Sequence, residues 1–100
     1  MIDWKQVVGF EWDEGNARKS FDKHSVSQAE AEQLFFNEPL LLVADEKHSG
    51  TEIRIHALGR TDSDRLLHTT FTLRQSGTKI RIISARTMSR KERNYYDREN

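Results

Sequence analysis

Apolar residues along the chain recur first with strand spacing and then with helix spacing. Residues 7–12 are mostly apolar and predict a short strand or extended segment. Asp13 can cap a helix that runs to about His24. The segment Ser27–Glu30 has the spacing of a capping box, in which a hydroxyl and a carboxylate bind the free N–H groups at a helix start. A second helix is therefore expected to continue to about Asn37.

The middle of the chain predicts strands. Leu40–Ala44 is an uninterrupted apolar run, as expected of a strand covered on both faces. After a turn over residues 45–50, apolar and polar positions alternate strictly. One face of this second strand carries Ile53, Ile55 and Ala57, and the other carries Glu52, Arg54 and His56.

A third strand, a hairpin and a last helix complete the pattern. Residues 66–73 place Leu67, Thr69, Phe71 and Leu73 on one face. Gln75–Thr78 has turn composition and leads into Lys79–Arg86, an apolar spine with cationic ends. Ser89–Glu92 is a second capping box, before a helix that carries Tyr95 and Tyr96.

These elements predict an α+β fold in one domain, residues 1–100. Four strands joined by short turns imply an antiparallel sheet, to which the opening segment could add a short strand. Two N-terminal helices and one C-terminal helix are expected to pack on one face of the sheet. The other face, with Glu52, Arg54 and His56, would be open to solvent or a ligand.

Composition narrows the class of protein. The chain has 100 residues, which suits one domain with a modest core. It has no cysteine, which excludes disulfides and thiolate metal sites and fits a reducing compartment. No apolar run has the length of a membrane span or a signal-peptide core. We therefore expect a cytoplasmic protein without membrane contact.

The net charge of zero hides an asymmetric chain. Residues 1–52 hold five Lys/Arg and eleven Asp/Glu, a charge of −6, and residues 53–100 hold eleven and five, a charge of +6. Most of the C-terminal cations are arginine, whose planar guanidinium suits phosphate and carboxylate groups. This half is therefore expected to bind anions. The run Arg90, Lys91 and Arg93 is also explained as a solvated helix face.

Several of these segments occur, in the same order, in a known protein family. They are Phe10-Glu11-Trp12-Asp13-Glu14-Gly15-Asn16, Lys23-His24, Val26-Ser27, Phe35-Phe36-Asn37-Glu38-Pro39, Asp45 with His48-Ser49, Glu52 with Arg54, Gly59-Arg60, Leu66-Leu67, Phe71-Thr72, Arg81-Ile82-Ile83-Ser84-Ala85-Arg86, Glu92-Arg93 and Tyr95 or Tyr96. On these segments the chain resembles the BrnT toxins of bacterial type II toxin–antitoxin systems over nearly its whole length. Ser20 and Ser25 depart from the pattern, since the family often has Asn and Gly there.

The resemblance implies a RelE-like fold and a function. It implies a metal-independent endoribonuclease that cleaves RNA and arrests growth, with no cofactor. It also implies a BrnA-like antitoxin with a ribbon-helix-helix domain, which neutralises the toxin in a hetero-oligomer. Gly after Lys23-His24 would suit a left-handed helix cap. Ser25 is expected to adopt that conformation at a modest cost in strain.

Metal-free RNA cleavage needs a base for the 2′-hydroxyl, an acid for the leaving oxygen and cations for the phosphate. The candidates are Glu52, His24 and Lys23 for proton transfer and Arg54, Arg81 and Arg86 for phosphate binding. Arg81 and Arg86 have opposite parity, so they can share a face only if the strand ends or bulges between them. We expect the strand to finish near Ser84, which leaves Arg86 free to turn toward the substrate.

Plainer explanations of the same residues stay open. Lys23 and His24 would also cap the negative end of a helix dipole, and His48 with Ser49 would also shape a turn. The face with Glu52 and Arg54 would also serve as solvated surface.

Two other functions compete with that of a toxin. A non-catalytic or degenerate toxin-fold module that binds an acidic partner or nucleic acid is the alternative. A metal-dependent nuclease is disfavoured, because Asp13-Glu14 and Asp45-Glu46 read as cap and turn residues. His68 is expected near His56, but no histidine spacing has a metal-binding helical pattern.

Overall fold

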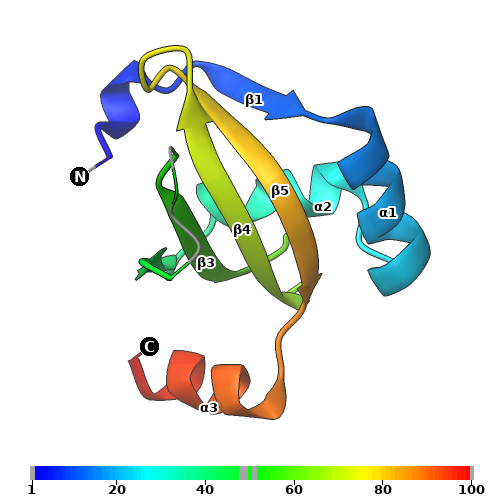
Figure 1. Ribbon diagram of the computed structural model, residues 1–100. Coiled ribbons are helices and arrows are strands. Elements are labelled where there is room, and N and C mark those ends of the chain that lie inside the picture. The colour runs from blue at the N-terminus through cyan, green and yellow to red at the C-terminus, as the bar shows by residue number, and fades with distance from the viewer. Residues whose placement is uncertain (1, 48–49, 51, 100) are drawn as a thin grey trace.

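The chain folds into one sheet with helices around it (Figure 1). The computed structural model describes residues 2–47, 50 and 52–99, without the side chains of residues 16, 17 and 20. Its elements are η1 (Trp4–Gln6), β1 (Gly9–Trp12), α1 (Glu14–His24), α2 (Gln28–Gln33), η2 (Leu34–Phe36), β2 (Leu41–Asp45), β3 (Arg54–Arg60), β4 (Leu66–Arg74), β5 (Lys79–Thr87) and α3 (Arg90–Glu99). The α+β class is as predicted. None of these helices is long and apolar enough to cross a membrane.

The sheet is mixed, whereas the sequence predicted a purely antiparallel one. In the described residues five strands have the order β1-β5-β4-β3-β2, and β2 to β5 are joined antiparallel, as expected. The opening segment does form a strand, but β1 pairs parallel to β5, with Phe10 opposite Ile80. No short turn joins these two strands, so nothing local in the sequence fixed their relative direction.

One face of the sheet carries the main core. The alternation predicted for β4 is confirmed, because Leu67 and Phe71 are fully buried on this face beside Ile80 and Ile82 of β5. In Figure 1, α2 lies behind β4 and β5 and covers this face. Leu34 of η2 also belongs to the core, and it comes so close to β3 that the backbone there needs a glycine.

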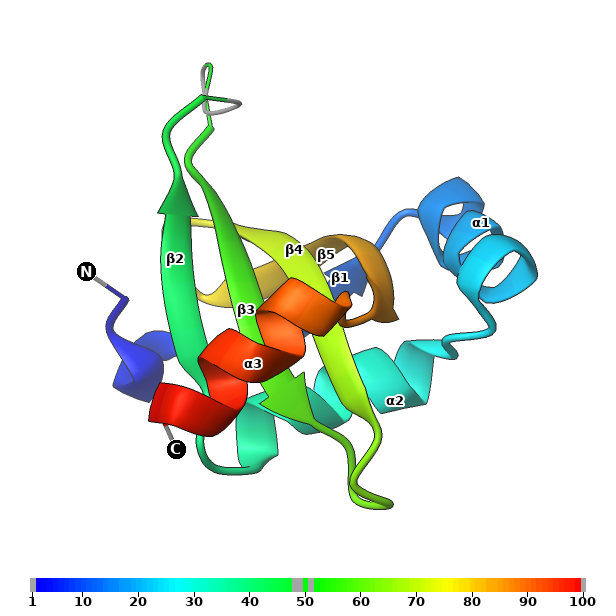
Figure 2. The same cartoon turned by 90° about the horizontal axis from the view of Figure 1, so that it is seen from below.

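The opposite face is covered at one end by α3, so the helices do not share one face as predicted. Figure 2 shows α3 running across β3. Leu58, Met88 and Tyr96 form a second buried cluster here, and the Tyr96 hydroxyl donates a hydrogen bond of 2.6 Å to the carbonyl of Pro39. The small apolar surface of α3 was enough to bury one tyrosine completely. No helix in the described part of the chain covers the rest of this face, which carries Arg54 and His56 of β3 and Arg81 of β5 and which we call the open face.

The apolar run 40–44 was expected to be covered on both faces, and that prediction is wrong. β2 is the last strand of the sheet and pairs only with β3. Its side chains are largely exposed, with Leu42 at 39% and Val43 at 45% of their full accessible surface. Leu41 packs against the buried cluster that includes Tyr96 of α3, but the strand as a whole is not enclosed. The apolar run therefore belongs to an edge strand and not to a central one.

Both predicted capping boxes are confirmed. The Ser27 hydroxyl accepts from the Glu30 N–H at 3.1 Å, and the Glu30 carboxylate accepts from the Ser27 N–H at 3.1 Å. At the start of α3, the Ser89 hydroxyl accepts from the Glu92 N–H at 3.2 Å and the Glu92 carboxylate accepts from the Ser89 N–H at 2.9 Å. Each box satisfies N–H groups that would otherwise lack a partner at the helix start.

The end of α1 has the predicted left-handed cap. Ser25 has a φ of 55°, and its N–H donates to the carbonyl of Phe21 at 2.8 Å. Arg65, which directly precedes β4, donates to the carbonyl of Ser25 at 2.7 Å and to that of His24 at 3.3 Å. It also donates to the Glu30 carboxylate at 3.0 Å. Arg65 therefore joins α1 and α2 to the sheet and is no plain surface charge.

Candidate active site on the open face of the sheet

A bulge in β5 decides which arginines reach the open face. Ile82 lies opposite Phe71 and Ser84 lies opposite Thr70, so Ile83 is an extra residue between two paired ones. The extra residue reverses the alternation of side chains beyond it. The prediction that the strand ends near Ser84 is therefore wrong, because β5 continues to Thr87 through the bulge.

Arg81 and Arg86 consequently point to the same face. Arg81 lies opposite Thr72, and Arg86 lies opposite His68, which is on the same face as Thr72. Arg54 and His56 of β3 share this face, because His56 lies opposite Thr70. The open face thus carries three of the six candidate site residues directly on its strands.

Arg86 is held in place by a carboxylate from α3. Its Nη1 and Nη2 donate to the two carboxylate oxygens of Glu92 at 2.8 and 2.9 Å, and Nη1 also donates to the Thr87 carbonyl at 3.1 Å. The bond from Arg86, helped by the Ser89 N–H, lowers the pKa of Glu92 to about 2 despite partial burial. Glu92 in turn raises the pKa of Arg86. Within the described residues, these bonds leave the edge of the guanidinium formed by Nε and Nη2 for a further acceptor.

Two histidines lie in contact beside Arg86, as the sequence predicted for His56 and His68. Their ring centroids are 4.8 Å apart. His56 is oriented by Thr70, whose hydroxyl lies 2.9 Å from Nδ1, and by Asp45, whose carboxylate lies 3.0 Å from Nε2. Burial, with the positive charge of Arg86, lowers the pKa of His68. His68 is therefore uncharged at neutral pH and can accept a proton.

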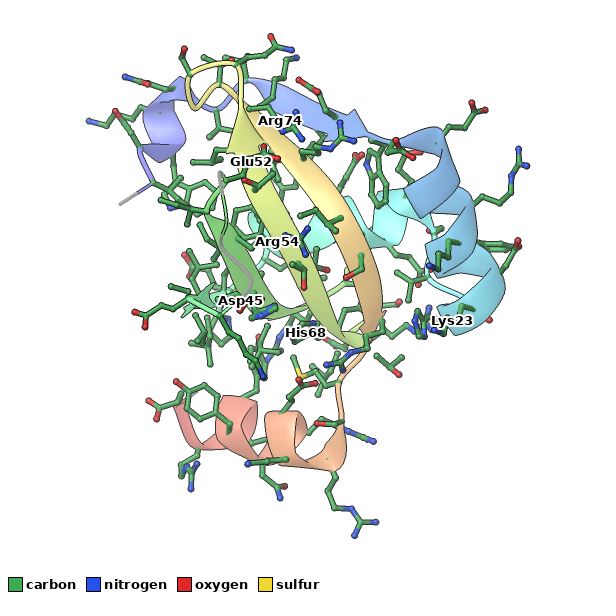
Figure 3. The ribbon with its side chains drawn as sticks, viewed as in Figure 1. Lys23, Asp45, Glu52, Arg54, His68 and Arg74 are labelled. Atoms are coloured by element: carbon green, nitrogen blue, oxygen red, sulfur yellow. The ribbon has the colours of Figure 1, made fainter. Side chains whose placement is uncertain are left out.

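Glu52 lies at the far end of the open face (Figure 3). It precedes β3, and its carboxylate binds Arg74, with Nε 2.6 Å from Oε2 and Nη2 3.0 Å from Oε1. In Figure 3, Arg54 lies between this ion pair and His68. Glu52 and Arg54 are thus close in the fold, as predicted, but Glu52 already has a cationic partner.

Arg81 is paired toward the β1 side of the sheet. Its Nη1 lies 4.0 Å from a Glu11 carboxylate oxygen, and its Nη2 lies 3.5 Å from one of Asp13. Glu11 is the register partner of Arg81 in the parallel pair of β1 and β5. The contact between Arg81 and Glu11 could not be expected, because the predicted sheet lacked the parallel pairing of β1 with β5.

Lys23 and His24 lie apart from the other candidates. They end α1, which packs beside β5, and Figure 3 shows Lys23 beyond β5, on the side away from Asp45 and Glu52. Lys23 is exposed, and the His24 carbonyl accepts a bond from Arg65. This placement agrees with the plainer explanation, in which the two residues cap the end of a helix. His48 and Ser49 lie outside the described residues.

Sequence reasoning gave Asp45 and Glu92 no part in the site. Asp45 was assigned to a turn, but it ends β2 opposite Arg54 and reaches diagonally to His56. The antiparallel register of β2 and β3 would have indicated this contact. Glu92 was recognised only as a capping residue. Among the described residues, no three His, Cys, Asp or Glu side chains are grouped so that they could hold a metal ion.

Comparison with known proteins identifies a family and a similar fold. A family model described as "Ribonuclease toxin, BrnT, of type II toxin-antitoxin system" matches residues 12–92. The fold and the match define a ribonuclease toxin of a type II toxin–antitoxin system. The 1.1 Å crystal structure of the Brucella abortus ribonuclease toxin BrnT aligns with a TM-score of 0.64 at 19% identity, over 84% of this chain and 100% of that one. No curated protein matches the sequence.

The chain belongs to the BrnT family of ribonuclease toxins. The resemblance stated from the sequence is thereby confirmed, and so is the class of function. At 19% identity the crystal structure supports the fold alone. The likeness to RelE stays a prediction.

Proposed function

We propose that the chain is a metal-independent endoribonuclease that cleaves RNA in the cytoplasm and so arrests growth. A BrnA-like antitoxin with a ribbon-helix-helix domain neutralises it in a hetero-oligomer. The observation that carries the cleavage proposal is the meeting of Arg86, Arg54 and the His56–His68 pair on one open face. These groups include both cations for a phosphate and imidazoles for proton transfer.

The reaction that fits these groups is an internal transfer on the RNA phosphate. The 2′-oxygen attacks the neighbouring phosphorus and forms a P–O2′ bond, while the P–O5′ bond breaks. A base takes the proton of the 2′-hydroxyl, and an acid gives a proton to the leaving 5′-oxygen. The products are a 2′,3′-cyclic phosphate and a 5′-hydroxyl, so atoms and charge balance without a metal ion.

Roles follow from position and charge. Arg86 offers the Nε–Nη2 edge of its guanidinium to the phosphate, and Arg54 contacts the same phosphate or the next. His68 acts as the base, since its lowered pKa keeps it uncharged. His56 is held by Asp45 and orients His68 through ring contact.

The other candidates keep roles in the proposal. Glu52 is the second candidate for the base, and Arg81 binds the RNA backbone on the β1 side. Lys23 and His24 are the candidates for the acid that protonates the leaving 5′-oxygen, reached by RNA that crosses β5.

The test is RNA cleavage by the purified protein in EDTA. We expect 5′-hydroxyl and cyclic-phosphate ends from the wild-type chain, and a loss of at least about 100-fold in His68→Asn, the size typical of removing a general base. Arg98→Ala, an exposed arginine at the end of α3, is the matched control and should cleave normally. Intact RNA from well-folded wild-type protein would refute the proposal.

Growth arrest separates the enzyme from the non-catalytic module. Expression without antitoxin should stop growth for the wild type and not for Arg54→Met. Harmless wild-type expression, with folded protein in the cell, would instead support the module. Co-expression with a ribbon-helix-helix antitoxin should restore growth and give a complex on size-exclusion chromatography.

A further inference from the structure

A pocket opens between α3 and the open face, next to the proposed cleavage site. Its volume is about 390 Å³, within the range of roughly 300–1,000 Å³ that small-molecule sites occupy. Its lining residues are Val43, His56, Leu58, His68, Glu92 and Tyr95. Four of these lie on β2, β3 and β4, and two lie on α3. The pocket thus exists only because α3 crosses this end of the sheet.

The walls of the pocket are aromatic and aliphatic. Tyr95 is 38% exposed, although its neighbour Tyr96 is fully buried. Val43 is 45% exposed and Leu58 is buried, and both come from the sheet opposite α3. A partly exposed aromatic ring facing aliphatic side chains is a surface on which a flat apolar ligand can stack.

One residue that lines the pocket also binds Arg86, the arginine that is proposed to bind phosphate. Glu92 lines the pocket, and its carboxylate also receives the 2.8 Å bond from Arg86. His68 lines the pocket and lies opposite Arg86 across β4 and β5. A ligand in the pocket therefore lies within one or two residues of a phosphate on Arg86. In RNA, a base and the phosphate of the same nucleotide are likewise close neighbours.

We propose that this pocket binds one nucleobase of the RNA, stacked on Tyr95, beside the phosphate that is cleaved. The inference rests on the proposed ribonuclease function and adds a subsite to it. Single-stranded RNA is recognised largely through bases that stack on aromatic side chains. The subsite also positions the substrate, because a base held on Tyr95 fixes the distance of its phosphate from Arg86.

The pocket should prefer purines to pyrimidines. Two of its polar groups are engaged, since Glu92 holds Arg86 and the Ser89 N–H, and His56 holds Asp45 and Thr70. The other polar groups of the lining are the His68 ring, which acts as the base in the proposed mechanism, and the Tyr95 hydroxyl. Few hydrogen-bonding groups then remain to read the edge of a base. Preference must come from stacking strength, which grows with the area of the ring system.

The chain contains only two tyrosines, which allows a direct test by NMR. In protein labelled with ¹³C at its tyrosine rings, we add a five-residue oligoadenylate whose 2′-hydroxyls are methylated, so that it cannot be cleaved. The ring signals of Tyr95 should move upfield as a base stacks on them. Those of Tyr96, which is fully buried, should stay in place and act as an internal control. A Tyr95 signal that is unmoved at saturating oligoadenylate would overturn the proposal.

Variants connect the subsite to cleavage. Tyr95→Ala should weaken oligoadenylate binding roughly tenfold, within the range expected for loss of one base–aromatic stack. Tyr95→Phe should bind normally, and Asn94→Ala, on the exposed side of the same helix, is the matched control. Oligouridylate should bind the wild type more weakly than oligoadenylate. Equal binding of Tyr95→Ala and wild type, with both folded by circular dichroism, would overturn the stacking role.

The outcomes separate the subsite from the ribonuclease function. If the wild type cleaves RNA but the Tyr95 ring does not respond, the subsite is refuted and the cleavage proposal stands. If the ring responds but no RNA is cleaved, the base site stands and the cleavage proposal falls. If Tyr95→Ala loses only antitoxin binding, the pocket belongs to the protein interface and the base site is refuted.

Discussion

Glu92 offers the sharpest test of the electrostatics at the site, through the variant Glu92→Gln. Its carboxylate receives two bonds from Arg86, at 2.8 and 2.9 Å, and one from the Ser89 N–H at 2.9 Å. These bonds lower its pKa from 4.5 to about 2. Each unit of pKa shift corresponds to about 1.4 kcal/mol, so the lowered pKa of Glu92 stabilises the folded state by about 3 kcal/mol at neutral pH. Solvent screening reduces the figure to about 2 kcal/mol, because the Arg86 side chain is 38% exposed.

The sign of the pH dependence follows from the direction of this shift. A carboxylate whose pKa is lowered by folding stabilises the protein above its ordinary pKa of 4.5. That contribution is lost as the pH falls from 4.5 to about 2. The wild type should therefore lose stability steeply over this range. Glu92→Gln should lack this part of the loss, so that the two stabilities converge toward pH 2.

The assay is urea unfolding followed by circular dichroism at pH values from 2 to 7. Asp97→Asn, an exposed carboxylate on the same helix, is the control and should follow the wild type. A gap between wild type and Glu92→Gln that is the same at pH 7 and pH 2 would refute the reasoning. It would mean that Glu92 acts through packing or capping and not through its charge.

Three further predictions concern the α1 cap, the core and the cleavage chemistry. Ser25→Gly should raise the free energy of unfolding by about 1 kcal/mol, because glycine adopts a φ of 55° without strain; an unchanged melting temperature would contradict this. Gly59→Ala should destabilise the fold by about 1–3 kcal/mol in urea, since its Cβ would lie 3.0 Å from Cγ of the fully buried Leu34; no loss would show that Leu34 can move. The cleavage rate should rise with pH and level off below pH 6.5, because burial and Arg86 lower the pKa of His68; a rate independent of pH from 5 to 8 would remove His68 as the base.

Local signals in the sequence were reliable for the helices and for most of the sheet. Ser27 and Ser89 begin helices where their capping boxes predicted, and β3 and β4 have the predicted alternation. The errors concern contacts between distant segments. The parallel pairing of β1 with β5 depends on residues about seventy positions apart, for which no periodicity gives the direction. The position of β2 at the sheet edge likewise depends on the strand order as a whole.

The sequence predicted which residue types form the candidate site, but it predicted less of how they are arranged. Arg54 and His56 were placed correctly on one face, and the contact of His56 with His68 was expected. Arg86 faces the open side through the bulge at Ile83. The opposite parity of Arg81 and Arg86 allowed either a bulge or an early strand end, and the sequence did not decide between them. A bulge is recognised only when the register of the neighbouring strand is known. Glu92 was missed because its capping role already explained it.

The parallel pairing of β1 with β5 has a consequence for how the toxin is made. The first strand to leave the ribosome cannot take its place until β5, near the other end of the chain, has been synthesised. Loop closure over so many residues is slow compared with forming the hairpins of β3, β4 and β5. Glu92, which fixes Arg86, comes later still in the chain. We therefore expect a nascent chain to lack the complete open face, on which cleavage is proposed, until nearly all of the residues described here have been synthesised.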